Sequence, residues 1–143
     1  MESGGGNFME TVVGARFGAG TISATGVEVV IEPRGRGLVV THVLGEIDLL
    51  GVSLLRPCFE RQLRSVRALV LDFTETSYLS AAGLSLLLQT GVDARSRNIP
   101  WALAAARPVL RPIEVTGLER QLPVYRDVPP AVDAVCMPSR LSA

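Results

Sequence analysis

Residues 68–84 have the sequence ALVLDFTETSYLSAAGL. The first part, Ala68–Phe73, is a short continuous apolar run, which is typical of a strand buried on both faces. A helix is predicted from Ser80 to Arg95, because apolar side chains recur there at helical spacing. Those on one stripe are Leu84, Leu87, Leu88 and Val92. A buried strand followed by a helix predicts a sheet packed against helices, in the α/β class.

Two further strands and a helix are predicted ahead of this unit. β-branched residues nearly alternate over Val27–Ile31, and a second β-rich run covers Leu38–Leu44. The turn-forming residues between them, Pro33–Gly37, predict that the two strands pair as a hairpin. A helix is then expected over Ser53–Leu63. Pro57 should lie in its first turn or mark its true start, because proline disrupts a helix interior.

The C-terminal part continues the alternation of strand and helix. Trp101–Ala106 is predicted to be a buried strand, and residues 124–125 a last short one. One helix is predicted over Pro108–Val115, with Gly117 as its C-terminal cap. A final helix is predicted over Ala131–Met137, opened by two prolines.

Together these elements predict one domain over residues 26–143. It should contain a mixed sheet of four to five strands packed against about four helices. Residues 1–25 are rich in glycine. Such a segment loses much conformational entropy on ordering and buries little surface, so a flexible arm is expected there. Thr11 and Thr21 in this arm would be accessible to a kinase.

Composition argues against several classes of protein. The chain has 143 residues, 48% of them hydrophobic and 20% charged, which suits a single domain with its own core. Fourteen basic residues balance fourteen acidic ones, so no nucleic-acid partner is expected. No run approaches the roughly 20 apolar residues of a membrane helix, and no signal-peptide pattern begins the chain. A cytoplasmic protein without a membrane span is therefore expected.

Neither an enzyme nor a metal site is indicated. His42 is the only histidine, and no Gly-x-Ser-x-Gly pattern supplies a nucleophile beside it. The chain has no lysine, which excludes a phosphate-binding loop of the Gly-Lys type. Cys58 and Cys136 lie among apolar residues on predicted helices, and we interpret them as buried, unreactive thiols or as a regulatory disulfide. A binding module without a cofactor is expected.

Three segments in a particular order point to a family. Val70–Phe73 followed by Leu79–Leu84 resembles the signature strand, loop and helix of STAS domains, the sulphate-transporter and anti-sigma-factor-antagonist modules. Gly45–Asp48 is similar to the Gly-Glu-Leu-Asp that follows their second strand. Arg107–Leu118 resembles their late helix, which ends in Ser/Thr-Gly-Leu. The resemblance covers about residues 26–137 and implies the STAS fold.

The resemblance also implies a function, that of a bacterial anti-sigma factor antagonist. Such a protein binds a kinase-type anti-sigma factor and so frees the sigma factor. In the family, the kinase phosphorylates a serine or threonine within the pattern Asp-Ser/Thr-Ser/Thr-Gly-Leu at the start of the signature helix. The three positions before Gly83 are here Ser80, Ala81 and Ala82. The acceptor position, Ala81, has no hydroxyl, so the usual phosphorylation switch is expected to be absent.

The resemblance places the partner-binding surface at the start of the signature helix. The residues it implies are Asp48, Ser80, Ala81, Ala82, Gly83 and Leu84. A helix N-terminus carries unpaired N–H groups and a partial positive charge, and Gly83 would let a partner approach the backbone there. Ser80 is interpreted as the helix N-cap, as a shifted phosphate acceptor, or as both. Asp48 is interpreted as a cap of the next segment or as a partner-facing residue.

Two alternatives keep the fold and change the function. The first is a free-standing STAS regulatory subunit of a transporter, of the lipid-transport ABC type. The second is a small-ligand or nucleotide sensor with an anion site at the helix N-terminus. The identity of the bound partner separates these alternatives from the antagonist.

Overall fold

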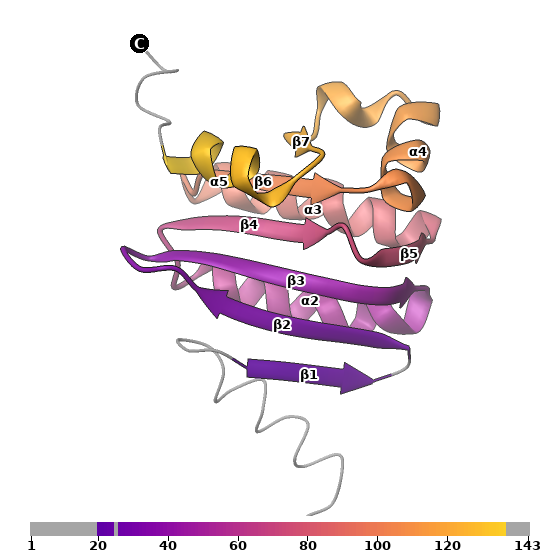
Figure 1. Ribbon diagram of the computed structural model, residues 1–143, viewed down its shortest axis with the longest axis horizontal. Coiled ribbons are helices and arrows are strands. Elements are labelled where there is room, and N and C mark those ends of the chain that lie inside the picture. The colour runs from indigo at the N-terminus through magenta and orange to yellow at the C-terminus, as the bar shows by residue number, and fades with distance from the viewer. Residues whose placement is uncertain (1–19, 25, 137–143) are drawn as a thin grey trace, which may run out of the picture.

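The computed structural model describes residues 20–24 and 26–136 (Figure 1). Its strands form a seven-stranded sheet. They are β1 (Gly20–Ala24), β2 (Val27–Pro33), β3 (Leu38–Ile47), β4 (Ala68–Phe73), β5 (Thr76–Leu79), β6 (Trp101–Ala105) and β7 (Val124–Tyr125). The helices of this part of the chain are α2 (Leu49–Leu63), α3 (Ala81–Ser96), α4 (Arg107–Val115) and α5 (Val128–Cys136), with a 3₁₀ turn η1 (Leu118–Arg120).

The sheet combines an antiparallel and a parallel half. Six strands follow the order β1-β2-β3-β4-β6-β7, in which β1, β2 and β3 are antiparallel neighbours and the other neighbours are parallel. β5 lies off this path and pairs in parallel with β3. The predicted α/β class is confirmed, and α3, α4 and α5 begin and end within three residues of their predicted limits. The strand count is higher than the predicted four to five, because β1 and β5 join the five strands that the sequence indicates.

β1 lies in the last part of the segment predicted to be a flexible arm, so that prediction is wrong for residues 20–24. β1 pairs with β2 from Gly20 opposite Ile31 to Ala24 opposite Val27. The edge of β2 offers unpaired N–H and C=O groups. The free energy gained by pairing with them exceeds the entropy cost of ordering residues 20–24, although this glycine-rich segment buries little apolar surface. Residues 1–19 lie outside the described part of the chain.

β5 is too short to show a strand pattern in the sequence. It forms because β3 is ten residues long and runs past β4. Leu38–His42 pairs with β4, whereas Gly45–Ile47 pairs with β5. The register shifts between Gly45 and Glu46, and Gly45 has a φ of 104°, which favours glycine. This bulge directs the end of β3 toward β5.

Different helices cover the two faces of the sheet. α2 and α3 lie behind the sheet in Figure 1, and α5 lies in front, packed against β4 and β6. The larger core lies under α2 and α3 and includes Phe59 and Leu87. The smaller core lies under α5, where Val70 meets Ala131 and Val135. No helix of the described residues covers the part of the front face formed by β2 and β3.

α2 begins at Leu49 rather than at the predicted Ser53, and Pro57 lies inside it. The prediction that Pro57 occupies the first turn or marks the helix start is therefore wrong. The reason is Asp48, whose carboxylate accepts the N–H of Gly51 at 3.0 Å and so starts the helix earlier. Pro57 is exposed. Water can therefore bond to the carbonyl of Ser53, which a proline leaves without its helical donor.

Pro57→Ala should stabilise the domain by about 1 kcal/mol or more, because it restores a helical N–H and removes the clash of the ring with the preceding turn. Urea unfolding followed by circular dichroism measures the difference. Pro129→Ala is the matched control, since Pro129 lies in the first turn of α5, where proline is well tolerated. It should not stabilise the protein. A loss of stability in Pro57→Ala would show that Phe59 needs a bend at Pro57 to pack.

Candidate functional site

The starts of α2 and α3 lie side by side. Ile47, the last residue of β3, pairs with Leu79, the last residue of β5. The residue after each is a helix cap, Asp48 for α2 and Ser80 for α3. The backbone N–H of Ser80 donates to the carbonyl of Ile47 at 2.9 Å. The fold therefore brings together Asp48 and Ser80, two of the predicted site residues that lie far apart in the sequence.

Both capping side chains accept a backbone N–H. Asp48 Oδ1 accepts from Gly51 at 3.0 Å, and Ser80 Oγ accepts from Gly83 at 3.2 Å. The capping interpretation of Asp48 and of Ser80 is confirmed by these contacts. Asp48 is nevertheless exposed and Ser80 is half-buried, so capping leaves both accessible to a partner.

The other predicted residues of the signature helix differ in exposure. Ala81 is exposed, whereas Ala82 and Leu84 are half-buried and pack against the larger core. Gly83 is buried, and a Cβ added there would lie only 2.5 Å from Leu79 Cδ1. The expectation that Gly83 lets a partner approach the backbone is therefore wrong. Its missing side chain makes room for Leu79 inside the protein.

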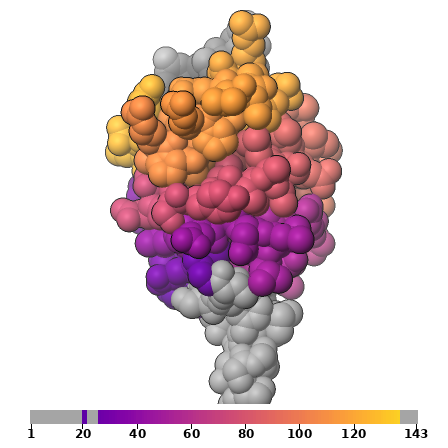
Figure 2. Space-filling view, turned by 90° about the vertical axis from the view of Figure 1, so that its right-hand side faces the viewer, coloured from indigo at the N-terminus to yellow at the C-terminus, as the bar shows by residue number. Residues whose placement is uncertain are grey.

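Large exposed apolar side chains, which the sequence patterns do not single out, lie within two residues of the two caps along the chain. Leu49 and Leu50, in the first turn of α2, are 69% and 62% exposed, and Tyr78 on β5 is 52% exposed. Figure 2 looks onto this end of the molecule, where the starts of α2 and α3 adjoin β5 below α4. We call the following residues the cap surface: Asp48, Leu49, Leu50, Tyr78, Ser80 and Ala81.

α4 extends this end of the molecule, because it packs against β5. One side of α4 bears a shallow hollow of about 440 Å³. Its lining residues are Arg107, Pro108, Arg111, Pro112 and Val115. Val115 is 74% exposed. α4 thus adds a second apolar patch, flanked by two arginines, beside the strand that carries Tyr78.

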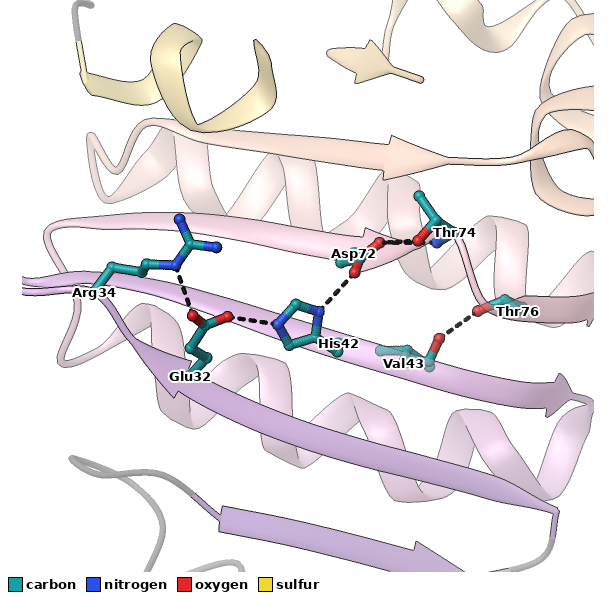
Figure 3. Close-up of polar contacts among 7 residues, drawn as sticks. All are labelled: Glu32, Arg34, His42, Val43, Asp72, Thr74 and Thr76. Atoms are coloured by element: carbon teal, nitrogen blue, oxygen red, sulfur yellow. Dashed lines mark hydrogen bonds and ion pairs between the residues drawn. The ribbon is translucent and has the colours of Figure 1, made fainter. Parts of the chain in front are cut away.

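His42 lies outside the cap surface, on the sheet face that α5 partly covers. Its Nδ1 lies 2.6 Å from Asp72 Oδ2 and its Nε2 lies 2.7 Å from Glu32 Oε1 (Figure 3). Because a carboxylate occupies each ring nitrogen, neither is free to take a proton from a nucleophile or to bind a metal ion. Within the residues that the structure describes, no three His, Cys, Asp or Glu side chains are placed to hold a metal.

The two cysteines have different surroundings. Cys58 is buried in α2, as predicted, and burial raises the pKa of its thiol to about 11. Such a thiol stays protonated and unreactive at neutral pH. Cys136 at the end of α5 is exposed, so the prediction that it is buried is wrong. α5 directs Ala131 and Val135 toward the sheet, which leaves the neighbouring Cys136 facing outward.

The family assignment follows from a family-level match. The sequence model of the STAS domain matches residues 24–131 of the chain. The chain belongs to the STAS domain family. The resemblance drawn from the signature segments is thereby confirmed.

Solved structures share this STAS fold. An anti-sigma factor antagonist from Mycobacterium paratuberculosis is 27% identical, with a TM-score of 0.68, over 80% of this chain and 98% of that one. The anti-sigma factor antagonist SpoIIAA in its unphosphorylated form is 20% identical, with a TM-score of 0.62, over 73% of this chain and 93% of that one. At that identity the likeness to SpoIIAA concerns the fold alone.

A curated relative matches part of the STAS domain. Osmosensory protein A of Mycobacterium tuberculosis is 35% identical over 71 residues, which are 50% of this chain and 45% of that protein. The match thus spans less than half the length of this relative. In the described residues of this STAS domain, no helix combines the length and hydrophobicity needed to cross a bilayer.

Proposed function

We propose that this STAS domain is a bacterial anti-sigma factor antagonist. It binds a kinase-type anti-sigma factor in the cytoplasm and thereby frees the sigma factor. The observation that carries the proposal is the cap surface, where exposed Leu49, Leu50 and Tyr78 lie within two residues, along the chain, of two adjoining helix caps. The antagonist from Mycobacterium paratuberculosis, which is similar over 98% of its own length, supports the same assignment.

The chemistry of the cap surface suits a protein partner. Several exposed large apolar side chains beside two adjoining helix starts are typical of an interaction site. In such sites a few anchor residues, tyrosine among the commonest, supply most of the binding energy. Asp48 and the free hydroxyl lone pair of Ser80 add polar groups that can orient the partner. Binding, rather than catalysis, is the activity that this arrangement supports.

The start of α3 also suggests how binding is controlled. Ala81 and Ala82 have no hydroxyl to phosphorylate, and the hydroxyl of Ser80 accepts the Gly83 N–H. We infer that the cap surface stays in a binding-competent form in the presence of ATP. The amount of complex is then set by the amounts of the two proteins, or by a modification of Ser80 that displaces its capping contact.

Affinity capture of the tagged chain from its own cells, with mass spectrometry, identifies the partner. Leu50→Arg should weaken the captured complex by about tenfold or more, because it places a charge among apolar contacts. Val92→Arg is the matched control. Val92 is a helical residue that is similarly exposed, at 59%, but it lies on α3 away from the cap surface. Equal losses of affinity in the two variants would contradict binding at the cap surface.

Asp48→Asn separates a partner contact from helix capping, because asparagine caps a helix as well as aspartate does. We expect unchanged thermal stability and an affinity several-fold lower, measured by isothermal titration calorimetry. Displacement of the sigma factor from its complex with the captured protein tests the last step of the function. Capture of a transporter ATPase instead of an anti-sigma kinase would reject the antagonist and support the transporter subunit.

A second candidate, a ligand sensor, is favoured by the name of the curated relative, Osmosensory protein A. Thermal-shift measurements with GTP, ATP and acyl ligands test this candidate. Stabilisation by one of them, lost in Ser80→Ala, would support an anion site at the start of α3. Unchanged melting temperatures with all of them would leave the antagonist as the supported function.

A further inference from the structure

A cluster of charged side chains crosses three strands on the sheet face that α5 partly covers, mostly over the uncovered part formed by β2 and β3. Glu32 lies on β2, His42 on β3 and Asp72 on β4, and His42 and Asp72 are register partners. Arg34 joins the cluster through its Nε, which donates to Glu32 Oε2 at 2.8 Å (Figure 3). The side chain of His42 is 26% exposed and that of Asp72 only 8%. The bond between His42 and Asp72 is thus largely shielded from water.

Each ring nitrogen of His42 faces a carboxylate oxygen, which only accepts hydrogen bonds, so both bonds form only when each nitrogen carries a proton. A neutral imidazole has a single N–H, so one nitrogen would direct its lone pair at a carboxylate oxygen. The imidazolium instead donates to both Glu32 and Asp72. Burial acts to lower the pKa of His42, but the hydrogen bonds to Glu32 and Asp72 and the negative charges of these carboxylates together raise it by more. The net shift is upward from 6.5.

The charged groups that face His42 come from both neighbouring strands. Among the described residues, Glu32 and Asp72 are those that act on its pKa, and Arg34 acts through Glu32. The hydrogen bond from His42, followed by that from Arg34, lowers the pKa of Glu32. α5, which covers the adjoining part of the sheet, packs apolar side chains against it, and its Asp133 is exposed. The charged groups that interact directly with the His42 ring are therefore the carboxylates of Glu32 and Asp72.

Asp72 connects this cluster to the cap surface. Its other oxygen, Oδ1, accepts the backbone N–H of Thr74 at 2.9 Å and the hydroxyl of Thr74 at 2.7 Å. Thr74 begins the turn into β5, and Thr76 on β5 donates its hydroxyl to the carbonyl of Val43 at 2.8 Å (Figure 3). Tyr78 lies two residues further along the same short strand. β5 itself is held by its pairing with β3, in which Tyr78 lies opposite Glu46. The carboxylate of Asp72 therefore contributes to the turn that leads from β4 to Tyr78.

We propose that protonated His42 is a pH-sensitive link between Glu32 and Asp72, which we call the clasp. As an imidazolium it fixes Asp72, Asp72 holds the turn between β4 and β5, and that turn positions Tyr78 for the partner. Only the last of these steps rests on the proposed function. When the ring loses a proton, its remaining N–H can serve one carboxylate while its lone pair repels the other. Even where the bond to Asp72 persists, it loses its charge assistance.

The direction of the pH dependence follows from the two pKa shifts. The raised pKa of His42 contributes stability that is fully present below the unfolded value of 6.5 and is lost as pH rises through the folded pKa. The lowered pKa of Glu32 contributes stability above 4.5 that is lost as pH falls through its folded pKa. Partner affinity should therefore be highest near about pH 6 and fall roughly threefold to tenfold toward about pH 9.

NMR of the isolated full chain tests the clasp without a partner. The chain has one histidine, so a single imidazole signal reports the titration of His42. We expect its midpoint above 6.5, and the same midpoint in the amide shift of Thr74. The amide of Gly51, which donates to the Asp48 carboxylate in a similar way, is the control and should not follow. A Thr74 amide that does not follow His42, or a His42 midpoint at or below 6.5, would overturn the proposal.

Glu32→Gln alters the clasp without removing the histidine. A glutamine amide can donate to a neutral Nε2 while Nδ1–H still serves Asp72, so both NMR midpoints should fall. The pH at which partner affinity falls should decrease with these midpoints. Thr74→Val removes the hydroxyl contact with Asp72. The NMR titration of His42 should be unchanged in this variant, and the change of the Tyr78 NMR signals with pH should be smaller.

The outcomes for the clasp and for the proposed function are distinguishable. If the partner binds but its affinity profile does not move in Glu32→Gln, the clasp is wrong and the antagonist assignment stands. If the NMR midpoints behave as expected but no anti-sigma factor binds at any pH, the proposed function is wrong and the clasp stands as a property of the isolated domain.

Discussion

Ala81→Ser should make the complex with the anti-sigma kinase dissociate on addition of ATP. Ala81 is exposed beside the cap of α3, so a serine hydroxyl there would be accessible to a bound kinase. Phosphorylation would add about −1.5 to −2 charges next to Asp48, on the apolar surface that contains Tyr78. Repulsion and desolvation of this charge should weaken binding by about 100-fold. The wild-type complex should remain intact under the same conditions.

Calorimetry with ATP or a non-hydrolysable analogue measures the affinity, and intact-mass spectrometry records phosphate uptake. Ala82→Ser is the matched control, because Ala82 is half-buried against the core and its hydroxyl would be less accessible. Ser80→Ala in the wild-type background tests the alternative acceptor. Phosphate uptake by the wild type that disappears in Ser80→Ala would show that the switch has moved by one residue instead of being lost.

Gly45→Ala should cost about 3 kcal/mol or more of unfolding free energy, the largest effect on stability expected for a single added methyl group. A Cβ at Gly45 would lie 2.1 Å from the carbonyl oxygen of Gly26, and backbone atoms cannot move aside as a flexible side chain can. The same carbonyl accepts the N–H of Glu46 at 3.1 Å. The bulge that leads β3 to β5 would therefore open and displace Asp48 from Ser80.

Gly35→Ala is the control for backbone strain. Gly35 also has a positive φ, 86°, but a Cβ there meets no atom within 4 Å. It should cost only about 1 kcal/mol in urea unfolding. Similar losses of unfolding free energy in the two variants would mean that the positive φ angle alone explains why position 45 requires glycine. The contact of the added Cβ with the Gly26 carbonyl would then be relieved without cost.

Much of the fold is visible in local patterns. The run Ala68–Phe73, apolar except for Asp72, is buried at every position, as expected for a central strand between two layers. The stripe from Leu84 to Val92 predicts α3, although Val92 itself is exposed. The position of Gly117, with a φ of 72°, marks the end of α4 as predicted.

The apolar part of the cap surface escaped prediction for a physical reason. The apolar spacing from Leu54 to Leu63 predicts a helix that starts at Ser53, with Pro57 in its first turn. With that start, Leu49 and Leu50 fall outside any helical pattern. Once Asp48 is recognised as the cap, both lie in the first turn of α2, ahead of the buried Leu55 and Phe59. The sequence does contain a signal for Leu49 and Leu50, because a cap residue, Asp48, directly precedes an apolar run.

Sequence patterns were sufficient for the fold class, most elements, the family resemblance and the loss of a hydroxyl at Ala81, because these depend on periodicity and on residue identity at fixed positions. The juxtaposition of Asp48 with Ser80, the exposure of Tyr78, the inward role of Gly83 and the bridging of Glu32 and Asp72 by His42 arise only in the tertiary structure. Each depends on which strands pair and in which register, and pairing between distant segments leaves no periodic signal in either segment.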